Sequence, residues 1–104
     1  MKIDMEKYKL SVIIPVYNAQ ETLEKTVTSV LVQLTEYDEV VLVDDGSTDN
    51  SLIICKKICE KNSNVHVIHQ KNTGSLAARI SGLQASKGEY ILYLDADDII
   101  LPNG

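Results

Sequence analysis

A regular alternation of short apolar runs with segments of helical periodicity restricts this chain to few folds. Four runs rich in Val, Ile and Leu span residues 10–16, 39–43, 65–68 and 90–94. Their short length and nearly continuous apolar character are typical of strands covered on both faces. The segments between them carry apolar residues at helical spacing, which gives the order β-α-β-α-β-α-β. This order predicts an α/β fold built on a parallel sheet.

Local signals indicate where two of the three helices begin or end. Ser47, Thr48 and Asp49 are good N-cap residues for the second helix. Lys87 and Gly88 are expected to end the third helix. The apolar stripe of that third helix consists of Leu76, Ile80 and Leu83.

The element order also predicts the topology. Right-handed crossovers place helices on both faces of the sheet, which gives a Rossmann-like three-layer α/β/α fold with strand order 3-2-1-4. Residues 10–104 are interpreted as one incomplete domain that follows an N-terminal extension, residues 1–9. A sheet that stops after its fourth strand has an exposed edge, so self-association through that edge is expected.

Charge and composition narrow the choice of partners and compartment. The formal net charge of −5 disfavours a nucleic-acid partner, because phosphate neutralisation needs clustered Lys and Arg. No apolar run approaches the roughly 20 residues of a membrane span, and residues 1–9 lack the apolar stretch of a signal peptide. We therefore expect a cytoplasmic protein, either free or at the cytoplasmic face of a membrane. Cys55 and Cys59 are expected to be reduced thiols on one helical face.

Polar residues collect where the predicted strands end, at the edge where parallel sheets bind ligands. The sharpest group is Asp95, Asp97 and Asp98, three carboxylates in four residues. Such carboxylates repel one another unless a cation or hydrogen-bond donors compensate, and hard oxygen ligands suit Mg²⁺ or Mn²⁺. The alternative is a solvated acidic turn that also caps a helix.

The other candidates each have a functional and a structural interpretation. Asp44 and Asp45 end the second strand, and strand alternation allows only one of them to face a ligand. Tyr17 can stack on a nucleobase or pack, and Arg79 can reach a phosphate or base or lie in solvent. The backbone amides of residues 72–75, at the start of the third helix, can meet an anion.

At four places the sequence resembles family 2 glycosyltransferases, which have the GT-A fold. Residues 11–18, SVIIPVYN, resemble the opening strand and loop of that family, and residues 43–49, VDDGSTD, resemble its second motif. Residues 88–98 resemble its metal-binding strand end, the DXD motif. The spacing of the third motif is matched by Gln70, Asn72, Gly74, Ala78, Arg79 and Gly82. Ile80 departs from the pattern, because Asn often follows the Arg there. The resemblance covers residues 10–104 and is specific for the family but not for a substrate.

The resemblance implies a nucleotide-diphosphate sugar donor, commonly a uridine one. It also implies inverting transfer to the hydroxyl of a carbohydrate or lipid-linked acceptor, as in cell-surface polysaccharide biosynthesis. By this resemblance Pro15 and Tyr17 line the base pocket. Asp45, in preference to Asp44, hydrogen-bonds to the base edge, and Arg79 lies near the base and diphosphate.

The same resemblance assigns the metal site and leaves the catalytic base open. It implies that Asp97 binds the metal directly and that Asp95 serves the ribose or the metal-bound waters. The general base that deprotonates the acceptor is expected beyond Gly104, so no residue of this chain is nominated for it.

Two other functions remain as alternatives. Asp95 and Asp97 also fit the nucleophile and acid/base of a haloacid-dehalogenase-like phosphatase, although that interpretation leaves the first three motifs unexplained. The chain can also be a non-catalytic module that binds a nucleotide or a partner.

Overall fold

The computed structural model describes residues 8–99, which form four strands and three helices. The elements in chain order are β1 (Tyr8–Val16), α1 (Leu23–Leu31), β2 (Asp38–Asp45), α2 (Ser51–Lys61), β3 (Val65–Gln70), α3 (Ser75–Ala85) and β4 (Gly88–Tyr93). Tyr8 and Lys9 of the expected N-terminal extension belong to β1, and the rest of that extension lies outside the described residues. Among residues 8–99, no helix has the length and apolar character needed to cross a bilayer.

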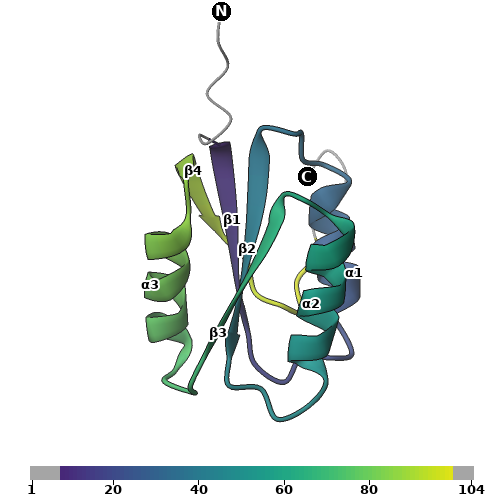
Figure 1. Cartoon of the computed structure of the whole chain (residues 1–104), viewed down its shortest axis with the longest axis vertical. Coiled ribbons are helices and arrows are strands. Elements are labelled where there is room, and N and C mark those ends of the chain that lie inside the picture. The colour runs from purple at the N-terminus through teal and green to yellow at the C-terminus, as the bar shows by residue number, and fades with distance from the viewer. Residues whose placement is uncertain (1–7, 100–104) are drawn as a thin grey trace, which may run out of the picture.

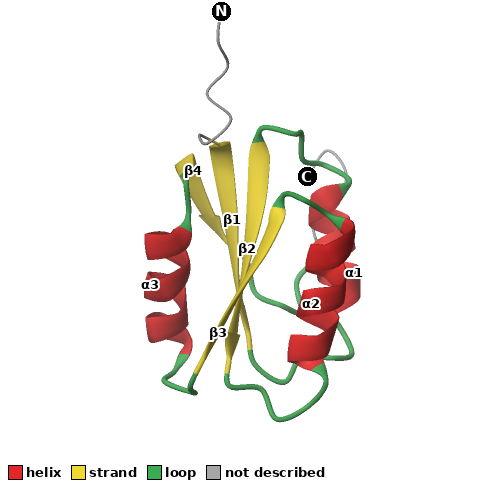
Figure 2. Cartoon of the chain, viewed as in Figure 1, coloured by secondary structure: helices red, strands yellow, loops and turns green. Residues whose placement is uncertain are grey.

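All four strands are parallel and lie in the order β3-β2-β1-β4, which confirms the predicted topology. Helices α1 and α2 cover one face of the sheet and α3 covers the other (Figures 1 and 2). β1 and β2 lie in the centre, and most of their apolar side chains are buried. The strand order reverses at β1, so the loops after β1 and β4 meet at one edge of the sheet.

Two apolar clusters, one on each face, form the core. On the α1 and α2 side, residues such as Ile14, Leu23 and Leu42 are fully buried. On the α3 side the buried cluster is smaller and consists of Ile13, Val41, Val43 and Ala78.

Helix α3 packs on the sheet through its small residues. Ala78 and Gly82 are its buried positions, whereas the predicted apolar stripe is solvent-exposed, at 70% for Leu76, 47% for Ile80 and 46% for Leu83. A Cβ atom added to Gly82 would lie only 2.4 Å from Cγ2 of Ile13. The helix therefore approaches the sheet too closely for a larger side chain, and Leu76, Ile80 and Leu83 are not the residues that pack on the sheet.

Both helix boundaries expected from local signals shift by a few residues. Asn50 takes the N-cap position of α2, and Asp49 instead accepts the backbone N–H of Ser51 through Oδ1 at 2.9 Å. α3 ends at Ala85, before the expected stop. Gly88 is the first residue of β4. The position requires glycine, because a Cβ there would lie 2.3 Å from the Ser11 hydroxyl oxygen.

A buried carboxylate fixes the start of β4 beside β1. Glu39, which is 1% exposed, accepts the Ser11 hydroxyl at 2.6 Å and the backbone N–H of Lys87 at 2.6 Å. The Ser11 oxygen in turn accepts the backbone N–H of Gly88 at 2.7 Å. These three hydrogen bonds set the register of β4, and thereby the position of the acidic turn that follows it.

Candidate functional site

An open cleft of about 750 Å³ lies between the loops that follow β1, β2 and β4 and the start of α3. This is the carboxyl edge of the sheet, where the sequence placed the site. The predicted site residues that line the cleft are Pro15, Tyr17, Asp45, Asp95 and Asp97. Asp44 and Arg79 are not among the lining residues.

The carboxylate of Asp45 binds the loop that leads into α3. Its Oδ1 accepts the backbone N–H of Thr73 and the side-chain amide of Gln70, each at 3.0 Å, and its Oδ2 accepts the backbone N–H of Gly74 at 3.0 Å. Burial disfavours the charged form, but these hydrogen bonds outweigh it, so the pKa of Asp45 is lowered. Of the amides expected to meet an anion at the start of α3, those of Thr73 and Gly74 therefore bind Asp45.

Asp44 lies on the other face of β2, as strand alternation requires. Its Oδ2 is 2.9 Å from Nδ1 of His69 and accepts the backbone N–H of Ser47 at 3.3 Å. Its Oδ1 is buried and has no hydrogen-bond partner within residues 8–99. Of the two aspartates, only Asp45 faces the cleft; a nucleotide contact remains a prediction for both.

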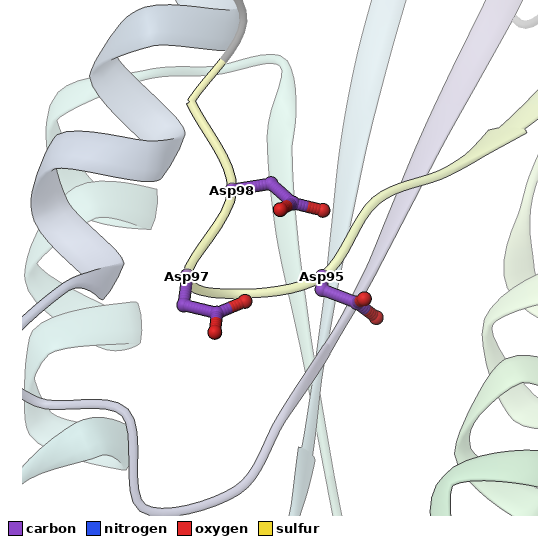
Figure 3. Close-up of side chains that lie close together, drawn as sticks. All are labelled: Asp95, Asp97 and Asp98. Atoms are coloured by element: carbon purple, nitrogen blue, oxygen red, sulfur yellow. The ribbon is translucent and has the colours of Figure 1, made fainter.

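Three carboxylates project from the turn that follows β4 (Figure 3). One oxygen from each of Asp95, Asp97 and Asp98 lies within 4.8 Å of the others, and all three side chains are exposed. The turn is closed by the backbone N–H of Asp98, which donates to the carbonyl of Asp95 at 3.0 Å. Several exposed carboxylate oxygens at this separation are a donor set that fits Mg²⁺ or Mn²⁺, which prefer hard oxygen ligands and retain waters.

Helix α1 holds the middle of this turn. Ala96 is 8% exposed and belongs to the apolar cluster on the α1 side. Its carbonyl oxygen accepts the hydroxyls of Thr22 at 2.9 Å and Thr26 at 2.8 Å. The sequence analysis did not identify either threonine. Their i, i+4 spacing is a weak signal because the partner carbonyl lies 70 or more positions away.

Arg79 of α3 lies next to the acidic turn. Its Nη2 is 3.7 Å from Oδ1 of Asp95, and its guanidinium carbon lies 5.9 Å from the centroid of the Tyr93 ring. An exposed pair of this length contributes little to stability. Its consequence is electrostatic, because a positive charge partly offsets the repulsion within the acidic turn.

Tyr17 is half-exposed on a loop that is hydrogen-bonded to the loop after β2. The next residue, Asn18, has a left-handed φ of 48°, and its Oδ1 accepts the backbone N–H of Thr48 at 2.8 Å. The backbone N–H of Asn18 donates to the Ser47 hydroxyl at 3.0 Å. The backbone is thus held on both sides of Tyr17, by β1 before it and by this loop pair after it.

The parallel sheet with strand order 3-2-1-4 and its three helices are the arrangement of part of a GT-A glycosyltransferase domain. The model of glycosyl transferase family 2 matches residues 11–104, and the chain belongs to this family.

Known relatives agree with this assignment. The chain is 43% identical over 95 residues to the glycosyltransferase GlyG of Streptococcus pneumoniae, and the aligned region covers 90% of this chain and 32% of GlyG. It is 42% identical over 96 residues to a cholesterol galactosyltransferase of Borreliella burgdorferi, with 92% and 27% covered. Among solved structures, residues 1–349 of TarS from S. aureus superpose with a TM-score of 0.81 and 36% identity, with 88% and 28% covered. The chain thus spans about a third or less of the length of these proteins.

Proposed function

We propose that this chain supplies the donor-binding part of a glycosyltransferase that uses a UDP-sugar, acts with inversion and is assisted by a divalent metal. The observation that carries the proposal is the placement of the acidic turn and Tyr17 in one cleft. An aromatic ring suits a nucleobase, and a cation held by carboxylates suits a diphosphate. TarS, the structural relative, has been solved with UDP and with UDP-GlcNAc.

The residues of the cleft then take distinct roles toward the donor. Pro15 and Tyr17 contact the base, and Asp45 reaches the base edge with acceptor capacity left over from its contacts to the α3 loop. Arg79 turns toward the diphosphate when the donor binds. Its ion pair with Asp95 is long and exposed and is therefore easily broken.

Asp97 is proposed as the direct ligand of Mg²⁺ or Mn²⁺, and Asp95 as the contact to the ribose or the metal-bound waters. When bound, the cation supplies electrostatic stabilisation of the negative charge that develops on the departing diphosphate. The residues of this chain bind and orient the donor.

The acceptor is proposed to be a carbohydrate or a lipid-linked sugar of a cell-surface polysaccharide. The cytoplasmic location expected from the sequence remains a prediction.

Calorimetric titration with UDP, in Mn²⁺ and in EDTA, tests this proposal. We expect tighter UDP binding in Mn²⁺, and we expect Asp97→Ala to weaken that binding while leaving the fold intact. Glu89→Ala is the matched control, because it removes an exposed carboxylate of β4 that does not line the cleft. Equal UDP affinity with and without the metal would rule out the role given to Asp97.

The family assignment argues against one of the two alternative functions and leaves the other open. Membership of family 2 leaves no support for a phosphatase with Asp95 as nucleophile. A module that binds the nucleotide without catalysis is consistent with the titration above, and only turnover measured on the whole protein separates it from a transferase.

Self-association is also proposed. Among the strands within residues 8–99, β4 pairs only with β1 and forms one edge of the sheet. Tyr90 is 60% exposed and Leu92 41% exposed. Exposed strand edges with apolar side chains recruit other chains. Ile99, which follows the acidic turn, is also exposed, at 57%.

Light scattering over a range of concentrations measures this association. Leu92→Lys should lower the mass at high concentration, because a charge at the edge opposes pairing. Val32→Lys, at an exposed position of 71% just after α1, is the control and should leave the mass unchanged. A mass that stays monomeric throughout, or that both variants lower equally, contradicts the proposal.

A further inference from the structure

Two threonine hydroxyls, one from the N-cap residue of α1 and one from within the helix, converge on a single carbonyl oxygen inside the acidic turn. Thr22 and Thr26 donate to the carbonyl of Ala96 at 2.9 and 2.8 Å. A carbonyl oxygen has two lone pairs and accommodates both donors. Ala96 is the residue between Asp95 and Asp97, so the contact is made at the centre of the carboxylate group.

Neither hydroxyl makes the local hydrogen bond that its position in the helix offers. Thr22 occupies the N-cap position, where a threonine oxygen ordinarily accepts a backbone N–H of the first turn, but it makes no such bond in the described structure. Thr26 is completely buried within α1, where a threonine hydroxyl ordinarily donates to the carbonyl one turn earlier. Both side chains instead bind the loop after β4.

These contacts set the direction in which Asp97 leaves the chain. The carbonyl of Ala96 belongs to the peptide plane that also contains the nitrogen and Cα of Asp97, so fixing the carbonyl fixes that plane. The buried side chain of Ala96 restrains the same residue from the core. A loop with three carboxylate oxygens within 4.8 Å of one another would otherwise spread, because like charges repel.

We propose that Thr22 and Thr26 are positioning residues of the divalent-cation site. They hold the acidic turn in the conformation that binds the cation. Cation binding therefore loses little further conformational entropy. This inference rests on the proposed function, in which carboxylates of the turn bind Mg²⁺ or Mn²⁺.

Titration of the full chain with Mn²⁺ alone, followed by electron paramagnetic resonance of the free ion, tests the inference. Replacing either threonine by valine keeps the branched shape and removes the hydroxyl. We expect Thr26→Val to weaken Mn²⁺ binding about tenfold, the scale for loss of a group that supports a metal ligand. The double variant with Thr22→Val should bind more weakly still. Melting temperatures measured in EDTA report the effect on the fold separately.

Two further variants separate positioning from packing. Thr26→Ser keeps the hydroxyl and loses the methyl group, so it should retain nearly wild-type Mn²⁺ affinity even if its melting temperature falls. Thr28→Val, at an exposed position of the same helix, should change neither quantity. Mn²⁺ affinity that follows the melting temperature instead of the hydroxyl overturns the inference, and so does wild-type affinity in the double variant.

The result for Asp97→Ala distinguishes a failure of the inference from a failure of the proposed function. If Asp97→Ala abolishes Mn²⁺ binding while the double valine variant retains it, only the positioning role is wrong. If the wild-type chain and Asp97→Ala bind Mn²⁺ equally, the cation site itself is wrong and both proposals fall. If the double variant fails to fold, the Mn²⁺ affinities of the two single valine variants test the positioning role.

Discussion

The Oδ2 atom of Asp45 lies 3.0 Å from the backbone nitrogen of Gly74, so the end of β2 and the entry to α3 are joined by a charged hydrogen bond. Gly74 has a φ of 101°, a conformation that few residues other than glycine adopt. The contact therefore depends on a loop conformation that the glycine permits. It also brings the loops after β2 and β3 to the same side of the cleft.

We expect Asp45→Asn to destabilise the protein by about 2–3 kcal/mol at neutral pH. The scale is that of hydrogen bonds to a charged acceptor, and the new amide group would face N–H donors. Urea unfolding measures the change. Glu89→Gln, at an exposed position on β4, is the control and should change stability little.

The destabilisation caused by Asp45→Asn should shrink in acid. The hydrogen bonds lower the pKa of Asp45 in the folded state, so its contribution is fully present above the unfolded pKa of about 3.9 and is lost as the pH falls toward the folded pKa. Unfolding measured between pH 6 and pH 3, roughly the range where this carboxyl protonates in the unfolded chain, should show the two curves converging. Parallel curves would mean that the ionised carboxylate does not stabilise the loop.

The contribution of Cys55 to the free energy of unfolding has the opposite pH dependence and is lost at alkaline pH. Burial, and secondarily the negative charge of Asp44, raises the pKa of the Cys55 thiol to about 12. The unfolded thiol ionises near its ordinary pKa while the folded one stays protonated, so this contribution is present below the unfolded pKa and is lost as the pH rises toward 12. Relative to Cys55→Ala, the wild type should lose about 1–2 kcal/mol by pH ~10. Val30→Ala also leaves a cavity but keeps the Cys55 thiol, so its difference in stability from the wild type should not change with pH.

Most of the fold follows from the sequence because each strand has a local signature. The runs at β1 and β2 are long enough and apolar enough to fix a central parallel pair, and the alternation with helices then fixes the order. The convergence of Tyr17, Asp45 and Asp97 on one cleft follows from that order, since the carboxyl ends of parallel strands share an edge.

The features that the sequence did not predict depend on distances that a periodic pattern does not encode. The helical spacing of Leu76 and Ile80 indicates the helix but not its inner face, because the helix lies so close to the sheet that only Ala78 and Gly82 fit there. The contacts of Asp45 with Gly74 and of Thr26 with Ala96 are likewise invisible locally. They join segments that are separated by 29 and 70 positions.

The close approach of α3 predicts that Gly82→Ala is destabilising. At an exposed helix position this change ordinarily stabilises by about 1 kcal/mol. Here the new methyl would lie 2.4 Å from Cγ2 of Ile13 and 3.1 Å from Cγ2 of Val43. We therefore expect a loss of about 1–3 kcal/mol in urea unfolding. In the Ile13→Ala background, which removes the first of these contacts, Gly82→Ala should cost less; strictly additive losses would contradict the packing described here.

The last prediction concerns Tyr17 and separates recognition of the base from binding of the diphosphate. The ring is 51% exposed at the cleft, and the loop around it is held by Asn18. If the ring stacks on uracil, Tyr17→Ala should weaken binding of uridine monophosphate by about 1–3 kcal/mol, in Mn²⁺ and in EDTA alike, because stacking acts on the base. Tyr17→Phe should retain most of the affinity, since it keeps the ring. Tyr37→Ala removes an equally exposed tyrosine outside the cleft, at 46%, and should have no effect. Unchanged affinity in Tyr17→Ala would leave the ring with a packing role alone.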